Sequence, residues 1–185
     1  MRADAAQRQR RILTEARHLF AERGHDISLD AIAEASEVGI ATLYRNFASR
    51  ADLIVAVTLD VIADIEAALA QAQAAITASP QRAWEQLVRE LVGLNLGAMT
   101  DAVGDASGWN APPEVTVAQD ATLKRFDDTL RTLAHHDAVR SDLRAIETIV
   151  AIGILTRPQP EAIQRITPHL VDHLVDAFLA WSRRA

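Results

Sequence analysis

Residues 28–53 read SLDAIAEASEVGIATLYRNFASRADL, which predicts a short helix, a tight turn and a second short helix. Ser28 can cap the first helix, and Gly39 can precede the second, which runs through Phe47. The apolar side chains that can pack the two helices together are Ile32, Ala33, Val38, Leu43 and Phe47. The pattern is a helix-turn-helix, and the major groove of DNA is wide enough to admit its second helix.

The second helix leaves one face outside this packing. Its outer side chains are Ile40, Ala41, Thr42, Tyr44 and Arg45. The open backbone amides at its start favour a phosphate, and Ile40 can meet a thymine methyl group. Glu37 must form the turn without the conformational freedom of glycine, which predicts either a different backbone there or some strain.

The spacing from Ala33 to Phe47 is Ala-x-x-x-x-Val-x-x-x-Thr-Leu-Tyr-x-x-Phe, and Ser-Arg-x-Asp-Leu follows at 49–53. This pattern resembles the signature of the TetR family of transcriptional regulators, and the resemblance covers about residues 8–55. Glu37, Gly39 and Asn46 depart from the glycine, hydroxyl cap and histidine that are common in the family. The DNA contacts that the resemblance implies are Ser28, Gly39, Ile40, Ala41, Thr42, Tyr44, Arg45, Asn46 and Arg50, the last as a phosphate contact.

Charge is divided unevenly along the chain. Residues 1–52 carry eight basic and eight acidic residues, whereas residues 53–185 carry 11 basic and 17 acidic ones. The beginning of the chain is locally basic, because Arg2, Arg8, Arg10, Arg11 and Arg17 face only Asp4 and Glu15. This excess can meet phosphate, and a solvated helix face is the more common explanation for it. The acidic remainder of the chain would be repelled by a polyanion, so we expect that only the first segment touches one.

Helix-forming residues dominate throughout, and alternating runs of β-branched residues are rare, so we expect an all-α fold of about nine helices. The expected division is a three-helix, helix-turn-helix DNA-binding domain at 1–52 and a helical-bundle ligand-binding and dimerisation domain at 53–185. The expected helices, besides a short helical turn near 100–113, are about 5–23, 29–36, 39–47, 49–77, 80–99, 114–135, 141–156 and 160–181.

The resemblance implies a ligand pocket in the second domain. The expected lining is Trp84, Leu87, Leu91, Asn95, Met99, Trp109, Phe126, Leu130 and Ile149. Asn95 stands out, because a polar amide on an otherwise apolar stripe needs a buried partner. Ordinary core packing is the alternative for the apolar members, since residues at helical spacing commonly form a core.

The last two predicted helices are apolar on more faces than a monomer needs. The resemblance implies that they pair with a second copy in a four-helix interface, and burial within one subunit is the alternative. The expected interface residues are Leu143, Ile146, Val150, Ile154, Ile163, Ile166, Leu170, Leu174, Phe178 and Trp181.

Several classes of site have no support in the sequence. The chain has no cysteine, and neither His135-His136 nor the pair His169 and His173 supplies a full metal ligand set. Nothing indicates a phosphate loop, a nucleophile elbow or an acid–base pair, so we expect neither an enzyme nor a cofactor. The chain also lacks a signal peptide and a long apolar span, which predicts a cytoplasmic protein without membrane contact.

The resemblance implies a repressor that binds a palindromic operator as a homodimer and is released by a small, largely apolar effector. The alternatives are a constitutive DNA-binding regulator, a helical adaptor that uses its apolar last helices to bind another protein, and a helical enzyme. Neither of the last two explains residues 33–53.

Overall fold

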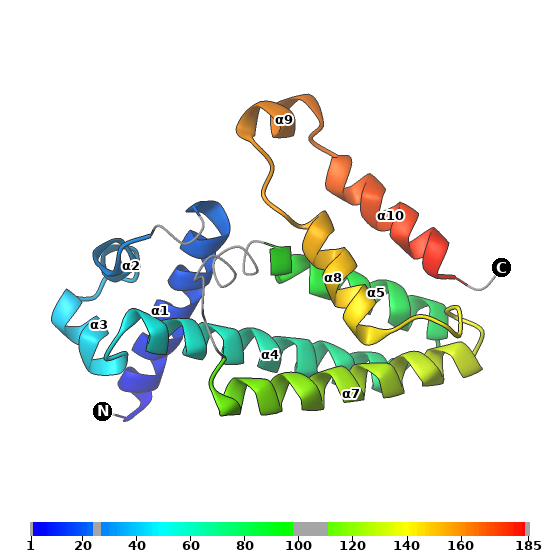
Figure 1. Ribbon diagram of the computed structural model, residues 1–185, viewed down its shortest axis with the longest axis horizontal. Coiled ribbons are helices and arrows are strands. Elements are labelled where there is room, and N and C mark those ends of the chain that lie inside the picture. Colours follow the sequence, from blue (N-terminus) through cyan, green and yellow to red (C-terminus); the bar gives the residue numbers. More distant parts are fainter. Residues whose placement is uncertain (1, 24–26, 98–110, 184–185) are drawn as a thin grey trace.

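The computed structural model describes residues 2–23, 27–97 and 111–183, and this part of the chain contains nine helices and no strand (Figure 1). The predicted all-α fold is confirmed. The helices are α1 (Arg2–Arg23), α2 (Leu29–Ala35), α3 (Ile40–Asn46), α4 (Arg50–Ala75), α5 (Pro80–Gly93), α7 (Pro113–His135), α8 (Ala145–Leu155), α9 (Glu161–Ile166) and α10 (Leu170–Ser182).

The first three helices pack around one apolar cluster. The stripe of α1 that contains Ile12, Ala16 and Phe20 is buried, as are Ile32 of α2 and Leu43 of α3. Ser28 forms the predicted cap at the start of α2, and Ser49 caps the start of α4. The Ser28 hydroxyl accepts a hydrogen bond from the Ala31 amide at 3.1 Å, and the Ser49 hydroxyl accepts one from the Asp52 amide at 3.1 Å.

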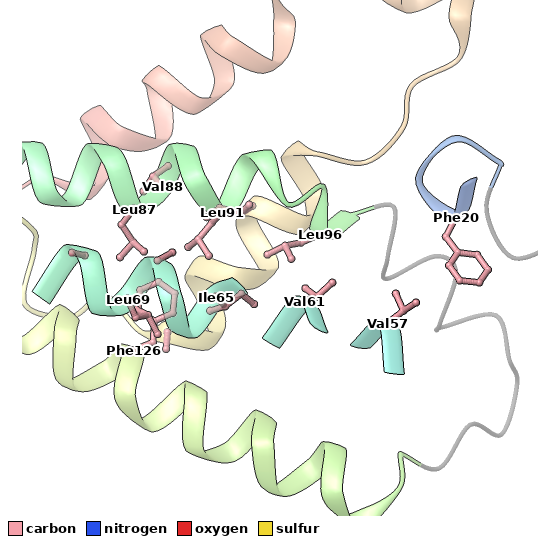
Figure 2. Packing of buried hydrophobic residues seen from close by; sticks show 14 of the residues in the cluster. Phe20, Val57, Val61, Ile65, Leu69, Leu87, Val88, Leu91, Leu96 and Phe126 are labelled. Atoms are coloured by element: carbon pink, nitrogen blue, oxygen red, sulfur yellow. The ribbon is translucent and has the colours of Figure 1, made fainter. Parts of the chain in front are cut away.

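Helix α4 connects this cluster to the rest of the molecule, where it lies between α5 and α7 (Figure 1). Leu87 and Leu91 of α5 point toward Ile65 and Leu69 of α4, and Phe126 of α7 approaches α4 from its other side (Figure 2). All five side chains are buried, so the hydrophobic effect holds the three helices together.

Helix α5 ends at Gly93, six residues before the predicted end at Met99. Asn95 adopts the left-handed conformation, with φ of 52°, and its amide donates to the Val92 carbonyl at 3.0 Å. This is a common way to end a helix, and asparagine tolerates the conformation better than most residues. Asn95 is exposed, so the expectation of a buried amide on an apolar stripe is wrong.

Helix α8 begins at Ala145, four residues after the predicted start at Ser141. The Asp127 carboxylate on α7 accepts a hydrogen bond from the Ala145 amide at 2.8 Å and so caps α8 from another helix.

The predicted helix over 160–181 is two helices, α9 and α10. Pro168 separates them: it disfavours helical geometry at Thr167, whose φ and ψ are −129° and 59°. Figure 1 shows α9 at the tip of the molecule, away from α4 and α7, and no residue of α9 is buried. Among the described residues, no helix is long and apolar enough to cross a membrane.

Candidate nucleic-acid interface

Helix α3 has one buried side and one exposed side. Leu43 is fully buried against the core, whereas Tyr44 is 50% exposed and Ile40 is 36% exposed. Ala41 and Arg45 are exposed as well, and Thr42 is half-buried. The predicted contact face therefore projects from the molecule on a short helix that is held from behind, as a helix that enters a groove requires.

The turn between α2 and α3 is held by two backbone hydrogen bonds, from the Glu37 amide to the Glu34 carbonyl at 2.9 Å and from the Val38 amide to the Ala33 carbonyl at 3.0 Å. This geometry gives Glu37 a φ of 53°. The predicted strain is confirmed: a left-handed conformation costs a residue with a side chain about 1 to 2 kcal/mol.

Three of the predicted contact residues make local structural contacts in the free protein. Ser28 caps α2, and the Asn46 side-chain amide donates to the Thr42 carbonyl within α3 at 2.7 Å. Gly39 is the N-cap of α3 and has open space around its α-carbon. That space allows another molecule to approach the start of α3 closely.

The Arg50 side chain contacts other segments of the same chain. It is half-buried, and its guanidinium group donates to the Ile27 carbonyl. The guanidinium carbon also lies 5.4 Å from the centroid of the Phe20 ring, within the range of a cation–π contact. Arg50 thus joins the start of α4 to α1 and to the segment before α2, a role that the sequence did not indicate.

We expect Arg50→Ala to lower the free energy of unfolding by about 1.5 to 3 kcal/mol, the range for a hydrogen bond to a charged group. Arg45→Ala is the matched control, because Arg45 is exposed and should change stability by no more than about 0.5 kcal/mol. Urea unfolding of both variants measures the difference. Equal stability of the two variants would show that Arg50 does not hold these segments together.

Two of the arginines expected to meet phosphate form ion pairs inside the protein. The Arg17 guanidinium lies 2.9 Å from the Asp60 carboxylate and 2.5 Å from the Asp64 carboxylate, both on α4. The Arg11 guanidinium lies 3.1 Å from the Glu37 carboxylate. The basic character expected of α1 is therefore partly neutralised, and Arg17 links α1 to α4.

The expected pocket residues that the structure describes differ in their surroundings. Trp84, Leu87, Leu91, Phe126 and Leu130 are buried in the core, and Ile149 packs against it half-buried. The Trp84 indole donates to the Ser182 hydroxyl at 2.8 Å. Asn95 instead lines a small pocket of about 160 Å³ with Arg17, His18 and other residues of α1 and α5. Met99 and Trp109 lie outside the described residues.

Most of the expected interface residues are exposed apolar side chains of α8, α9 and α10, a set that we call the apolar face. Its exposed members are Ile146, Val150, Ile154, Ile163, Ile166, Leu174 and Trp181. Leu170 and Phe178 are half-buried beside them. Leu143 is buried within the subunit, where it belongs to the core.

The histidines of α10 belong to no cluster of metal-ligating side chains in the part of the chain described. His169 and His173 have ring centroids 6.4 Å apart, and no group of three or more metal-ligating side chains is present there.

At the corner between α7 and α8, hydrogen bonds from the Arg140 guanidinium lower the pKa of the Asp142 carboxyl. Arg140 also lies over the Trp181 ring at 4.7 Å.

Residues 12–57 match the model for bacterial regulatory proteins of the tetR family. A TetR transcriptional regulator from Streptomyces coelicolor is 25% identical, with a TM-score of 0.65 over 96% of this chain and 99% of that one. A TetR regulatory protein from Mycobacterium vanbaalenii is 24% identical, with a TM-score of 0.61 over 99% of each chain.

The TetR-like regulator LfrR from Mycobacterium smegmatis, solved in complex with proflavine, has the same fold. Its TM-score is 0.68 at 20% identity, over 96% of this chain and 98% of that one. No curated protein sequence matches this chain.

Proposed function

Because the chain is a DNA-binding transcriptional regulator of the TetR family, we propose that it binds a palindromic operator as a homodimer through α3. The observation that carries this proposal is the exposure of Ile40 and Tyr44 on a helix whose Leu43 is fully buried. The two side chains are one turn apart, so they can face the same groove. Apolar and aromatic groups there favour contact with thymine methyl groups. Arg45 would bind a guanine edge or a phosphate beside them.

The homodimer is supported by the apolar face. Monomeric proteins seldom leave so many large apolar side chains exposed on neighbouring helices, and a two-fold interface would bury them. Two-fold symmetry would also present two copies of α3 to half-sites about one helical turn of DNA apart. Palindromy of the operator follows from that symmetry.

We assign residues 1–52 to DNA binding and residues 53–185 to dimerisation and ligand sensing, in the cytoplasm. Helix α4 begins beside α3 and continues between α5 and α7, and Arg17 ties α1 to it through two carboxylates. A change in the bundle would therefore move the DNA-binding helices through α4. A ligand drives such a change only if its affinity differs between the two states.

We infer that the effector is small and largely apolar and that its binding releases the operator. The support is the apolar interior of the bundle, together with a neighbour of the same fold that was solved with proflavine. A constitutive DNA-binding regulator is the second candidate. The observation that favours it is the tight burial of Trp84, Leu87 and Leu91, which act as core in this state.

Selection of bound fragments from genomic DNA with the purified protein tests the operator proposal. We expect a palindromic site with two half-sites about one helical turn apart. Enrichment of no common sequence would contradict specific binding. Displacement of the selected fragment in a screen of small apolar compounds tests the sensing proposal, and binding that no bound compound changes would favour the constitutive candidate.

We expect Tyr44→Ala and Arg45→Ala each to weaken binding to the selected fragment by about 1 to 3 kcal/mol in each half-site. Both side chains are exposed, so the fold should persist. Arg131→Ala is the control, because Arg131 is an exposed arginine on α7. Fluorescence anisotropy with labelled DNA measures the effects, and unchanged affinity in both α3 variants would show that α3 is not the contact face.

A further inference from the structure

Glu37 places a negative charge directly before the helix that we propose enters the groove. Its side chain is 79% exposed, and only Val38 and Gly39 separate it from the start of α3. A helix that enters a major groove brings the chain just before it close to the phosphate backbone. A carboxylate at this position is repelled by those phosphates, where an amide or a glycine would not be.

The same carboxylate pairs with an arginine of α1. The Arg11 guanidinium lies 3.1 Å from the Glu37 carboxylate across 26 positions of sequence, and Arg11 remains 45% exposed on its outer side. Arg8 and Arg11 line one shallow groove on α1 with Asp4 and Gln7, so this helix side carries arginines with room for a phosphate. In the free protein, however, Arg11 is paired with Glu37.

The backbone conformation of the turn does not favour glutamate at position 37. The turn requires a φ of 53°, a conformation that a glutamate adopts only against steric resistance and that glycine adopts freely. The contact of Glu37 with Arg11 is exposed, and exposed ion pairs contribute little to stability. The ion pair therefore contributes little to the stability of the fold, and the charge of Glu37 remains accessible to a molecule that approaches this surface.

We propose that Glu37 limits the affinity of each DNA-binding unit for the phosphate backbone, by repelling phosphates and by occupying Arg11. The proposal rests on the proposed function and adds a specificity-determining residue to it. Contacts to phosphate raise the affinity for every sequence, whereas contacts to base edges raise it only for the operator. Glu37 weakens the phosphate contacts and so increases the difference between the affinity for the operator and the affinity for random DNA.

The test is the affinity of Glu37→Gln for a random-sequence duplex over a series of salt concentrations. One additional phosphate contact in each subunit of the homodimer steepens the slope of log affinity against log salt by about 1.8, because each contact contributes about 0.9. At roughly 0.1 M salt we expect about sixtyfold tighter binding, from the same relation. Arg11→Ala in the Glu37→Gln background should remove most of this gain, because the released arginine supplies it.

Asp120→Asn is the matched control, because it removes one exposed negative charge on α7 and leaves the turn unchanged. Glu37→Gly is the second variant: it removes the same charge and also the resistance to a positive φ, so it folds if Glu37→Gln does not. Unchanged affinity and slope in the Glu37 variants, while Tyr44→Ala still weakens operator binding, would overturn the role of Glu37. Unchanged binding in Tyr44→Ala as well would overturn the contact face itself.

Discussion

Ile154→Glu should convert the protein into a monomer and abolish binding to the operator at concentrations where the original protein binds. Ile154 is 65% exposed on α8, on the apolar face that also includes Val150 and Ile146. An uncompensated charge in a buried interface costs about 3 to 5 kcal/mol, and a two-fold dimer contains the substitution twice. The dissociation constant of the dimer should therefore rise by at least about a thousandfold.

Light scattering coupled to size exclusion measures the mass of the variant, and anisotropy measures its DNA binding. Val117→Glu is the matched control, because Val117 is 68% exposed on α7, outside the apolar face. The control should leave both mass and DNA binding unchanged. An Ile154→Glu variant that remains dimeric would show that the subunits meet elsewhere, and a monomer with full operator affinity would show that dimerisation does not support DNA binding.

Gly97→Ala should destabilise the protein by about 3 kcal/mol or more, the upper part of the range for overpacked sites. A β-carbon at Gly97 would lie 2.1 Å from the Gly153 carbonyl oxygen and 2.6 Å from the Arg157 backbone nitrogen. These are backbone atoms at the end of α8, so no side chain can rotate away. The Gly97 amide also donates to the buried Thr156 hydroxyl at 2.9 Å, which fixes the two segments at this distance.

Gly93→Ala is the control for this prediction. A β-carbon at Gly93 has no atom within 4 Å, and Gly93 is the last residue of α5, where alanine favours the helix. Thermal unfolding should show a clear loss of stability for Gly97→Ala and none for Gly93→Ala. Because α8 carries part of the apolar face, Gly97→Ala should also weaken the dimer. Equal stability of the two variants would mean that α8 does not pack closely on Gly97.

The sequence alone was sufficient to predict the features that depend on residues close together in the chain. The stripe of α1, the Ser28 and Ser49 caps and the strained Glu37 were all predictable, because helical periodicity, capping and backbone sterics act over a few positions. The division of α3 into a buried Leu43 and an exposed Tyr44 follows from the same periodicity. The exposed face of α8 and α10 was predictable for this reason too.

Contacts between distant parts of the chain were not predictable in this way. The Asp127 carboxylate that caps α8 lies 18 positions before Ala145, and the carbonyl that binds Arg50 lies 23 positions before it. Both depend on how helices pack, which no local pattern contains. Pro168 is different: its effect on the last helix is local and could have been predicted, but the apolar pattern on either side of it favoured one continuous helix.

The length of α4 has a mechanical consequence. Its 26 residues span about 39 Å, so a tilt of about 5° at the end between α5 and α7 displaces the end beside α3 by about 3 Å. In a two-fold dimer the symmetry axis relates the two displacements, and where they point along the line between the two α3 helices, the separation of these helices changes by about 6 Å, nearly a fifth of one turn of DNA. If the proposed function holds, helix α4 would convert a small rearrangement in the bundle into a mismatch of the two α3 helices with both half-sites.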